Sequence, residues 1–344
     1  MVSRGAAEPG RPRILVPQPI HEDGLRLLER YGEVQVALSA GMLSREELKA
    51  ALRSSDYFLS MGDYTLDEDI LAANPALRGI SAIAGHPEEW IDLDAATRLG
   101  IPVTGLTRGP VLNTTAELTM ALILALAWRI LEADRFTRAG LFRQEQSVLF
   151  MTRSLEGKTL GLVGLGGVGN AVARRARPFQ MDIVYTKRTR LEVEAEGDLG
   201  ITWTPDLDDL LRRSDFVSLH ADYNESTHML IGPRQLATMK PTAFLINTSR
   251  GRLVDESALI EALRKRTIAG AGLDVYWNEP PVTYTPDVDP RLYELDNVIL
   301  IPHLGGATEE TLALLARLGA ENLVALIKGE RPSSIVNPGA LTVR

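Results

Sequence analysis

The sequence predicts an α/β protein with two doubly wound parallel sheets and a cleft between them. Two observations lead to this fold class. Short apolar runs alternate with amphipathic stretches of helical period along nearly the whole chain, as they do where parallel strands are joined by helices. A glycine-rich turn at 164–169 follows one apolar run in the middle of the chain and opens a helix. At 344 residues, the chain is long enough for two separate cores.

The N-terminal third of the chain shows one alternation of strands and helices. Strands are expected at 14–16, 34–38, 57–60, 80–84 and 101–103. Helices are expected at 23–31, 44–54 and 92–99. Ser44 and Glu47 form a Ser-x-x-Glu capping box at the start of the second helix. Residues 1–12 have no apolar core and contain Pro and Gly, so we expect a disordered lead-in and not a signal peptide.

A second alternation follows a long helix expected at 114–138. Strands are expected at 158–163, 182–185, 216–220, 243–247, 270–274 and 298–301. Helices are expected at 170–177, 206–213, 233–239, 256–266 and 308–328. The last helix begins beyond the final strand, so we expect it to pack back on the first domain. The expected domains are therefore a discontinuous one, 13–107 with 308–344, and a central one, 108–307.

The turn at 164–169 fits the fingerprint of a Rossmann-like, dinucleotide-binding domain. Gly164 permits the tight turn after the strand, Gly166 lets a pyrophosphate approach the backbone, and Gly169 lets the helix pack closely on the strand. The pyrophosphate then rests at the helix N-terminus, whose free N–H groups and dipole favour an anion. The alternative is a plain strand-to-helix corner, but the flanking strand and helix favour a bound dinucleotide.

The end of the next strand predicts which dinucleotide is preferred. An NAD enzyme usually carries Asp or Glu there, which accepts hydrogen bonds from the ribose hydroxyls. This chain carries Lys187, Arg188, Thr189 and Arg190 instead. Three cations attract the 2′-phosphate that a carboxylate would repel, so we expect NADP(H) to be preferred over NAD(H). The alternative is a solvated basic turn.

Composition argues against several classes of protein. The net charge of −8 and the lack of a long basic run disfavour a nucleic-acid or membrane-surface role. With no cysteine, the chain has no disulfide, no thiolate nucleophile and no zinc–sulfur site. Its five histidines are too dispersed to suggest a metal site. The longest apolar run, 118–128, is too short to span a bilayer and is expected to be a buried helix. We therefore expect a cytoplasmic protein.

Three segments resemble one family in their residues and in their order. They are Asn-Thr-Ser-Arg-Gly-Arg-Leu-Val-Asp-Glu at 247–256, Gly-Leu-Asp-Val-Tyr-Trp-Asn-Glu-Pro at 272–280 and Ile-Pro-His-Leu-Gly-Gly-Ala-Thr at 301–308. Ile-Asp-Leu-Asp-Ala-Ala at 91–96 and Thr-Ala-Glu at 115–117 extend the match. The chain thus resembles the D-isomer-specific 2-hydroxyacid dehydrogenases. This resemblance implies a substrate domain built from both chain ends, a central nucleotide domain and a homodimer.

The resemblance also implies three catalytic residues. Arg250 binds the substrate's carboxylate and carbonyl in this pattern, His303 is the acid/base, and Glu279 orients it. The residue types suit hydride transfer to a 2-oxo acid. A protonated imidazole stabilises the charge on the carbonyl oxygen and delivers the proton, a neighbouring carboxylate keeps it protonated, and a guanidinium binds a carboxylate through two bonds. A single Arg, Glu or His of this kind is usually solvated or structural. The three motifs taken together favour a catalytic role for these residues.

Further residues are expected to contact the cofactor. Asp274 matches the family residue that holds the nicotinamide carboxamide, and His220 is expected to be structural and close to the cofactor. His21 and His228 are expected at the surface. The expected cofactor-binding residues are Gly164, Gly166, Gly167, Val168, Gly169, Lys187, Arg188, Thr189, His220, Ala221, Thr227, Thr248, Ser249, Asp274, Gly305 and Gly306.

Two loops depart from the family pattern where the substrate is expected. The usual Gly-x-Gly-x-Asp loop is replaced by one containing His86, Pro87 and Glu88, and Pro87 has no N–H to donate to a substrate carboxylate. Arg108 stands where a proline is usual in the next loop. We expect these four residues to bind substrate, and His86 with Arg108 suggests a pocket for an anionic group such as a phosphonate. The alternative is that Arg108 points to solvent and His86 caps a turn.

The leading functional prediction is an NADP(H)-preferring reductase that converts a small 2-oxo acid, such as glyoxylate or hydroxypyruvate, to the D-isomer of the 2-hydroxy acid. One alternative in the same architecture is a phosphite dehydrogenase, which keeps an Arg, a Glu and a His and places a cation where His86 falls. Glu279 counts against a formate dehydrogenase, which has Gln there. The other alternative is a nucleotide-sensing binding protein that resembles the transcriptional corepressors of this family.

Overall fold

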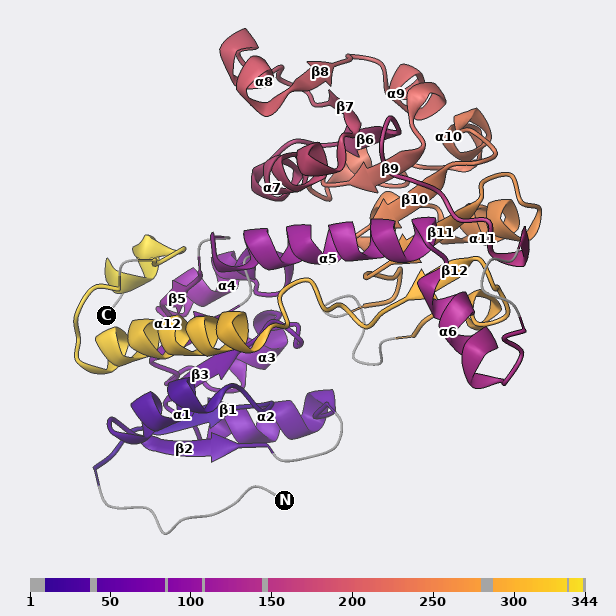
Figure 1. Cartoon of the computed structure of the whole chain (residues 1–344). Coiled ribbons are helices and arrows are strands. Elements are labelled where there is room, and N and C mark those ends of the chain that lie inside the picture. The colour runs from indigo at the N-terminus through magenta and orange to yellow at the C-terminus, as the bar shows by residue number, and fades with distance from the viewer. Residues whose placement is uncertain are drawn as a thin grey trace. The chain divides into compact units, whose positions relative to one another are not determined.

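The chain folds into two compact units (Figure 1). The computed structural model describes residues 10–37, 42–83, 86–106, 109–143, 148–279, 287–332 and 334–342. Unit 1 comprises Met1–Pro110, Asn278–Pro286 and Thr308–Arg344, and unit 2 comprises Val111–Trp277 and Asp287–Ala307. This division differs from the expected domain boundaries chiefly at Asn278–Pro286, which groups with unit 1.

Unit 1 contains a five-stranded sheet in which all pairings are parallel. Its strands are β1 (Arg13–Val16), β2 (Glu33–Val36), β3 (Tyr57–Ser60), β4 (Gly79–Ala82) and β5 (Val103–Thr104). They lie in the order β2-β1-β3-β4-β5. Every residue of β3 and β4 is buried, because helices cover both faces of the sheet.

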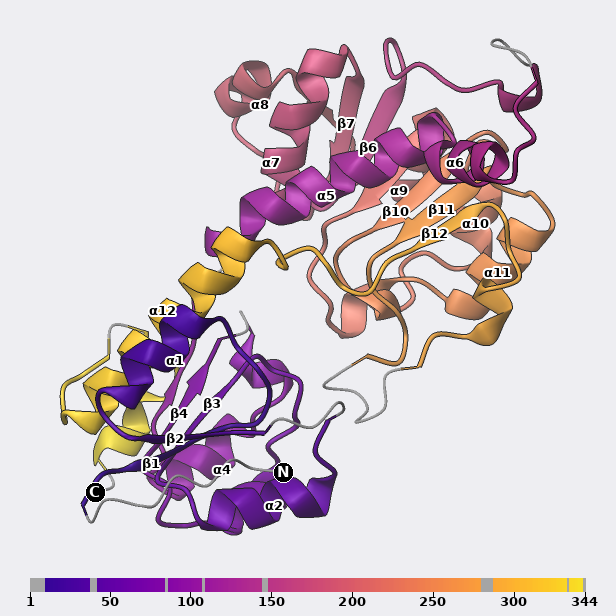
Figure 2. The same ribbon diagram turned by 60° about the horizontal axis from the view of Figure 1, so that its bottom comes forward.

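Helices α1 (Glu22–Glu29) and α12 (Glu309–Ile327) lie side by side on one face of this sheet, as both views show (Figures 1 and 2). They approach closely at Gly24, where a Cβ would lie 2.7 Å from the carbonyl oxygen of Ala316. The Ser81 hydroxyl of β4 donates to the carbonyl of Gly319 in α12 at 2.8 Å. The C-terminal helix therefore packs on strands from the N-terminal part of the chain.

Three shorter helices cover the other face of the unit 1 sheet. They are α2 (Arg45–Arg53), α3 (Glu68–Ala72) and α4 (Leu93–Arg98). Their apolar residues share a core cluster with Phe58 of β3 and Ile80 of β4. The predicted capping box of α2 is confirmed, since Ser44 accepts from the N–H of Glu47 and its own N–H donates to the Glu47 carboxylate at 2.8 Å.

Unit 2 contains a seven-stranded sheet, again parallel throughout. Its strands are β6 (Thr159–Val163), β7 (Asp182–Thr186), β8 (Ile201–Trp203), β9 (Phe216–Leu219), β10 (Phe244–Asn247), β11 (Gly270–Leu273) and β12 (Val298–Leu300). Their order is β12-β11-β10-β9-β6-β7-β8. The strand order therefore reverses direction between β6 and β9. Two doubly wound parallel sheets confirm the predicted fold class.

Helices cover both faces of this sheet as well. The helices of unit 2 are α5 (Gly109–Ala127), α6 (Ile130–Arg138), α7 (Gly167–Ala176), α8 (Val193–Leu199), α9 (Leu207–Arg213), α10 (Pro233–Thr238) and α11 (Glu256–Arg264). Apolar residues of α5 and α7 share one core cluster with Leu160 and Leu162 of β6, whereas Val163 packs in the cluster of α9, α10 and α11. Alternate residues of a strand thus enter opposite cores. Single 3₁₀ turns lie at Pro87–Glu89, Val148–Phe150, Arg177–Phe179, Glu225–Thr227, Gly251–Leu253, Pro290–Leu292 and Pro338–Thr342.

The prediction of one helix over 114–138 was wrong. Arg129 adopts a left-handed conformation with φ of 52°, which ends α5 and starts α6 in a new direction. Its guanidinium donates to Glu132 at 2.6 and 2.8 Å and to the carbonyl of Leu149 at 2.7 Å. The sequence has no Gly or Pro at this break, so the helical periodicity of its apolar residues gave no sign of it. The pattern also missed α3, α8 and β8, which are only three to seven residues long.

Among the described residues, one helix, α5, is long and apolar enough to cross a membrane by length and composition. Eight of its residues are buried, and Ala116, Ile123 and Ala127 lie in the core cluster that contains β6. This position in the core accounts for the apolar sequence of α5.

The expected disordered lead-in, residues 1–12, is only partly described. Residues 1–9 lie outside the described residues. Arg11 donates to the carbonyl of Gly32 at 3.2 Å, and the carbonyl of Pro12 accepts from Glu33 at 2.8 Å. Residues 11 and 12 are therefore held beside β2, and the ordered chain begins before the expected position.

Candidate active site

The carboxyl edge of the unit 2 sheet collects residues from five neighbouring strands. The fingerprint turn follows β6, His220 follows β9, Arg250 follows β10, Asp274 follows β11 and His303 follows β12. Because all these strands are parallel, the loops after them lie at one edge. The position between β6 and β9, where the strand order reverses, is where ligands bind in sheets of this kind.

The three fingerprint glycines meet three different requirements. Gly164 has φ of +90°, and a Cβ there would lie 2.6 Å from the carbonyl oxygen of His220. A Cβ at Gly169 would lie 2.8 Å from the carbonyl oxygen of Gly164, so the helix can approach the turn only without a side chain. A Cβ at Gly166 would meet nothing within 4 Å. Gly166 therefore presents an open stretch of backbone.

Helix α7 begins directly at this open backbone, with Gly166 as its N-cap. No side chain of the described residues caps the start of this helix, so its first-turn N–H groups lack a capping partner. Free N–H groups and the positive end of a helix dipole suit the pyrophosphate of a dinucleotide. The open face of Gly166 and the uncapped α7 thus fit the expected group.

His220 lies beside the fingerprint turn, at the end of β9. Its Nε2 lies 2.9 Å from the hydroxyl of Ser218. Burial lowers the pKa of His220 to about 4, so its imidazole is neutral near pH 7. The next residue, Ala221, accepts a hydrogen bond at 2.8 Å from the Ser249 hydroxyl, which joins the loops after β9 and β10.

The cations at the end of β7 do not all have the same role. Arg190 binds the buried carboxylate of Glu196 in α8 through two hydrogen bonds of 2.9 and 2.7 Å. Tyr185 donates to the same carboxylate at 2.6 Å. Hydrogen bonds from Arg190 and Tyr185 lower the pKa of Glu196 to about 2, and burial with this contact raises the pKa of Tyr185 to about 12. Arg190 is therefore engaged within the protein, which corrects the expectation of three cations for a phosphate.

Lys187 and Arg188 lie in a different setting. The Nζ of Lys187 donates to the carbonyl of Leu165 in the fingerprint turn at 3.3 Å. Arg188 and Thr189 are exposed. Within the described ranges, no ion pair or hydrogen bond of the Arg188 guanidinium is found, in contrast to that of Arg190. Of the three cations, Arg190 is thus bound to a carboxylate, Lys187 contacts the fingerprint turn, and Arg188 is exposed.

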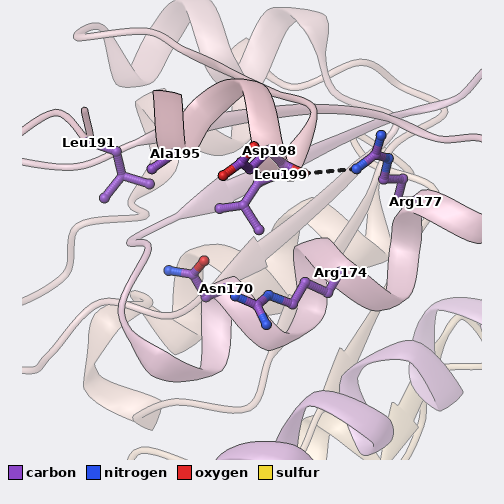
Figure 3. A pocket seen from close by; sticks show the side chains of 7 residues that line it. All are labelled: Asn170, Arg174, Arg177, Leu191, Ala195, Asp198 and Leu199. Carbon is purple, nitrogen blue, oxygen red and sulfur yellow. Dashed lines mark hydrogen bonds between the residues drawn. The ribbon is translucent and has the colours of Figure 1, made fainter. Parts of the chain in front are cut away.

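A surface pocket of about 470 Å³ lies between α7 and α8 (Figure 3). It is lined by Asn170, Arg174, Arg177, Leu191, Ala195, Asp198 and Leu199. Figure 3 shows Arg177 turned toward α8, where it donates to the carbonyl of Asp198 at 2.8 Å. None of the expected site residues lines this pocket.

Hydrogen bonds from a nearby side chain hold the loop that carries Arg250. The Asn247 side chain donates to the carbonyl of Arg250 at 2.9 Å and accepts from the N–H of Ser249 at 3.1 Å. A Cβ at Gly251 would overlap the carbonyl of Tyr276, so only glycine fits after Arg250. The backbone that carries the guanidinium is therefore closely defined.

His303 lies in a loop that Asp274 holds. The N–H of His303 donates to the backbone carbonyl of Asp274 at 3.0 Å, and the Asp274 carboxylate accepts from Leu304 at 2.6 Å and from Gly305 at 3.0 Å. His303 itself has φ of 51°, a strained conformation for a residue with a Cβ. Asp274 is 1% exposed. Its carboxylate thus organises the loop of His303, a role that the sequence did not predict.

Other expected residues have local partners. The hydroxyl of Thr227 accepts from the N–H of Asn224 at 2.8 Å and lies 2.7 Å from the carbonyl of Asp222, within a 3₁₀ turn. A Cβ at Gly306 would lie 3.0 Å from the Val111 side chain. The hydroxyl of Thr248 lies inside unit 2, 2.9 Å from that of Thr119.

The expected substrate-binding residues belong to unit 1 where they are described. His86 lies at the start of the 3₁₀ turn Pro87–Glu89, with its Nδ1 3.2 Å from the Glu88 carboxylate. Pro87 is buried and Glu88 is exposed. Glu279 belongs to the segment that groups with unit 1. Arg108 lies outside the described residues.

A parallel seven-stranded sheet with a glycine fingerprint at its reversal point defines unit 2 as a dinucleotide-binding domain of the dehydrogenase type. Comparison with known proteins agrees. The family model described as D-isomer specific 2-hydroxyacid dehydrogenase, NAD binding domain, matches residues 120–305. The chain is 40% identical over 336 residues to a glyoxylate reductase from Thermococcus litoralis, covering 96% of this chain and 98% of that one.

Solved structures extend this agreement to the whole fold. The TT0316 protein from Thermus thermophilus has a TM-score of 0.85 and 36% identity, covering 94% of this chain and 99% of that one. The NADPH-dependent glyoxylate/hydroxypyruvate reductase from Sinorhizobium meliloti, in complex with citrate, has a TM-score of 0.79 and 31% identity, covering 95% and 99%. The chain belongs to the D-isomer-specific 2-hydroxyacid dehydrogenase family. It is a nicotinamide-dependent oxidoreductase, which confirms the predicted family and enzyme class.

The open face of Gly166 leads to a prediction about cofactor binding. Gly166→Ala places a methyl group where the pyrophosphate approaches, yet it meets no protein atom within 4 Å. We expect the dissociation constant for NADPH to rise by about tenfold or more, a loss of ~1.4 kcal/mol or greater, with an unchanged urea midpoint of unfolding. Fluorescence titration measures the binding.

Gly197→Ala is the matched control, because Gly197 lies in α8 and its Cβ would also meet nothing within 4 Å. We expect this variant to bind NADPH like the parent. Equal binding by the Gly166 and Gly197 variants would contradict the placement of the pyrophosphate.

Proposed function

We propose that this protein is an NADP(H)-preferring reductase of a small 2-oxo acid. The observation that carries the proposal is the placement of Arg250 and His303 on loops after β10 and β12, at the same sheet edge as the dinucleotide fingerprint. A guanidinium and an imidazole near a nicotinamide suit a substrate with a carboxylate next to a carbonyl. The relative from Thermococcus litoralis is a glyoxylate reductase, which supports the same substrate class.

In the proposed mechanism, each side chain acts on one part of the acid. The Arg250 guanidinium binds the carboxylate through two hydrogen bonds and so orients the carbonyl. A reduced nicotinamide held at this edge would supply the hydride that reduces the carbonyl carbon. The imidazolium of His303 donates its proton to the carbonyl oxygen, which becomes the hydroxyl of the product. Glu279 keeps the role that the family resemblance gives it, as the residue that orients His303. Oxidation of the hydroxy acid reverses these steps.

We infer that the preferred acid has no anionic tail. An anionic tail would need a cation near the substrate, and the imidazole of His86 is already 3.2 Å from the Glu88 carboxylate. That carboxylate opposes a second anion. Glyoxylate and hydroxypyruvate therefore rank ahead of phosphonopyruvate and oxaloacetate. The pocket for a phosphonate that the sequence suggested now depends on Arg108.

The catalytic assignment predicts the effect of removing one imidazole. We expect NADPH oxidation with glyoxylate or hydroxypyruvate, and a fall in kcat of about 10² to 10⁴-fold in His303→Ala, because general acid catalysis contributes about that much. Steady-state assays against glyoxylate, hydroxypyruvate, pyruvate, phosphonopyruvate and oxaloacetate measure both the rate and the substrate preference. Arg250→Lys should raise KM, since an ammonium cannot form the paired bonds.

His228→Ala is the control, because His228 is exposed and its ring contacts the Tyr223 hydroxyl at 3.1 Å. Unchanged turnover in His303→Ala would contradict the assignment. NADP reduction by phosphite without turnover of any acid would favour the phosphite dehydrogenase alternative. Tight cofactor binding with no turnover, together with cofactor-dependent oligomerisation, would favour the nucleotide-sensing alternative.

We infer the preference for NADP(H) from the two cations that remain at the end of β7. In this fold the adenosine ribose lies at that strand end, so Lys187 and Arg188 are placed to bind a 2′-phosphate. Arg190 takes no part, because Glu196, which also accepts from Tyr185, holds its guanidinium on α8. A solved complex of the Sinorhizobium meliloti relative contains NADP, which supports the same preference.

The double variant Lys187→Glu with Arg188→Ala tests this preference. We expect the ratio of kcat/KM for NADPH to that for NADH to fall by about a hundredfold or more, since two charged hydrogen bonds at about 1.5–3 kcal/mol each are lost. Lys265→Glu with Arg264→Ala makes the same charge change on the exposed end of α11 and should leave the ratio unchanged. A ratio unaffected in both variants would exclude a phosphate site at Lys187 and Arg188.

We further propose that the protein is a homodimer. No residue of α6 is buried, and exposed apolar side chains are concentrated in α6 and its flanking segments. They are Trp128, Ile130, Leu131, Leu141, Phe142, Val148, Leu149 and Met151. Phe150 packs on Phe136 of α6 with ring centroids 4.9 Å apart, so the segment around Phe150, which follows α6 in the chain, lies against this helix. Arg138 pairs with Asp134 on the same helix at 2.8 Å.

An apolar surface whose charges are paired internally suits an identical surface more than a charged partner. We therefore expect Leu131→Glu with Val148→Glu to convert a dimer to a monomer, as measured by light scattering after size-exclusion chromatography. Val193→Glu is the control, because Val193 is an exposed valine on α8. A monomeric parent at micromolar concentration would contradict the proposal.

A further inference from the structure

Helix α5 carries buried hydroxyl groups on the face that it turns to the sheet. Thr115 is 8% exposed and Thr119 is 0% exposed, and the two are one helical turn apart on the same face. They interrupt a helix whose other buried residues are apolar. A buried hydroxyl needs a hydrogen-bond partner, so the partners of these threonines show what they connect.

The first connection leads to the loop of His303. The hydroxyls of Thr114 and Thr115 each lie 2.9 Å from the carbonyl oxygen of Gly305. The same two hydroxyls lie 3.2 and 2.8 Å from the carbonyl oxygen of Val111. Each hydroxyl has one hydrogen, so one can donate to Gly305 while the other donates to Val111. Gly305 is two residues after His303, so α5 is bonded to the loop of the proposed acid/base.

The second connection leads to the loop of Arg250. The hydroxyl of Thr119 lies 2.8 Å from the carbonyl oxygen of Thr115 and 2.9 Å from the hydroxyl of Thr248. Thr119 can therefore donate within the helix and accept from Thr248. Thr248 is 8% exposed and lies two residues before Arg250. One face of α5 is thus bonded to the loops that carry both proposed catalytic side chains.

Contacts within both loops connect the backbone atoms that are bonded to α5 with the residues that carry the side chains. Asn247 bonds to the backbone of Ser249 and of Arg250, so the segment after Thr248 is closed on itself. The Asp274 carboxylate accepts a hydrogen bond from the N–H of Gly305 at 3.0 Å. Gly305 is therefore held through its N–H as well as through its carbonyl. Because His303 adopts a strained φ of 51°, its loop depends on contacts of this kind.

We propose that Thr115 and Thr119 are positioning residues that hold the Arg250 and His303 loops at one fixed spacing, and this inference rests on the proposed catalytic roles of those two residues. The Thr119 hydroxyl already has a partner within its helix at Thr115, so its bond to Thr248 is not needed to satisfy it. The bond from α5 to the loop of Arg250 instead fixes that loop relative to the loop of His303, which is bonded to the same helix. A misplacement of about 1 Å in such a pair can cost about a hundredfold in rate.

Thr119→Val and Thr119→Ser test the proposal as a pair. Valine keeps the branched shape and removes the hydroxyl, whereas serine keeps the hydroxyl. We expect the valine variant to lose about tenfold to a hundredfold in kcat and serine to restore most of it. The dissociation constant for NADPH, measured by fluorescence titration, should remain that of the parent in both. Thr115→Val combined with Thr114→Val, which removes both hydroxyls that reach Gly305, should lose kcat in the same way, whereas Thr115→Ser should keep most of it.

A double-variant comparison separates positioning from a general loss of packing. If Thr119 and Thr248 act through their shared bond, Thr119→Val with Thr248→Val should lose no more kcat than either single variant. Thr137→Val is the control, since Thr137 is a helical threonine of α6 whose hydroxyl bonds only to the carbonyl of Ala133 among its described contacts, at 2.9 Å. It should retain the parent kcat. Additive losses at 119 and 248, or a serine variant as slow as valine, would overturn the proposal.

Hydrogen exchange distinguishes a failure of this inference from a failure of the proposed function. In Thr119→Val we expect faster amide exchange in 248–253 than in the parent, and in Thr114→Val with Thr115→Val we expect faster exchange in 301–306, with 159–163 of β6 unchanged in both. If the parent turns over no acid, the proposed function is wrong, and the exchange result still decides whether the threonines anchor the two loops. If the parent is active and neither kcat nor exchange changes in Thr119→Val, the positioning role is excluded.

Discussion

No side chain fits between the turn after β6 and the end of β9, and the arrangement of the candidate site depends on this constraint. Gly164 allows that turn to lie against the carbonyl of His220. The turn then directs α7 so that its N-terminus and the open backbone of Gly166 lie at the carboxyl edge of the sheet. Since the neighbouring strands are parallel, the loops of Arg250 and His303 end at the same edge. The strand order thus brings the glycine fingerprint and the loops of Arg250 and His303 together within unit 2.

Charged residues near this edge divide into those that build the protein and those that remain available to ligands. Arg190 binds the buried Glu196, which has a pKa lowered to about 2 and is therefore ionised throughout the neutral range. This pair holds α8 against the end of β7, and the proposed contacts to a 2′-phosphate fall to Lys187 and Arg188. Asp274 similarly uses both carboxylate oxygens to hold the loop of His303. Charge identity alone does not distinguish these roles, because they differ only in three-dimensional partners.

Whether an expectation was confirmed depended on how far apart in the sequence the interacting residues lie. The fold class, the family and the capping box at Ser44 rest on local patterns, and all were confirmed. The single helix over 114–138 was wrong because Arg129 breaks it through contacts with a later segment, including the carbonyl of Leu149. The expected catalytic residues came from motifs, whereas nothing in the sequence marked Glu196 as a partner of Arg190. A carboxylate six residues after an arginine is common on solvated helices as well.

The sequence by itself determined the alternation of strands and helices, the glycine fingerprint and the motif positions of Arg250, Glu279 and His303. These features follow from residue types that lie close together in the sequence. They are recognised by the period of the apolar residues, by the residues that tight turns require and by motifs at the ends of strands. Only the tertiary structure decided which polar groups share a hydrogen bond. Thr119 meets Thr248 across 129 residues of chain, and Thr115 meets Gly305 across 190. Such pairs arise because the sheet order brings distant strand ends beside one helix, and no local period records that order.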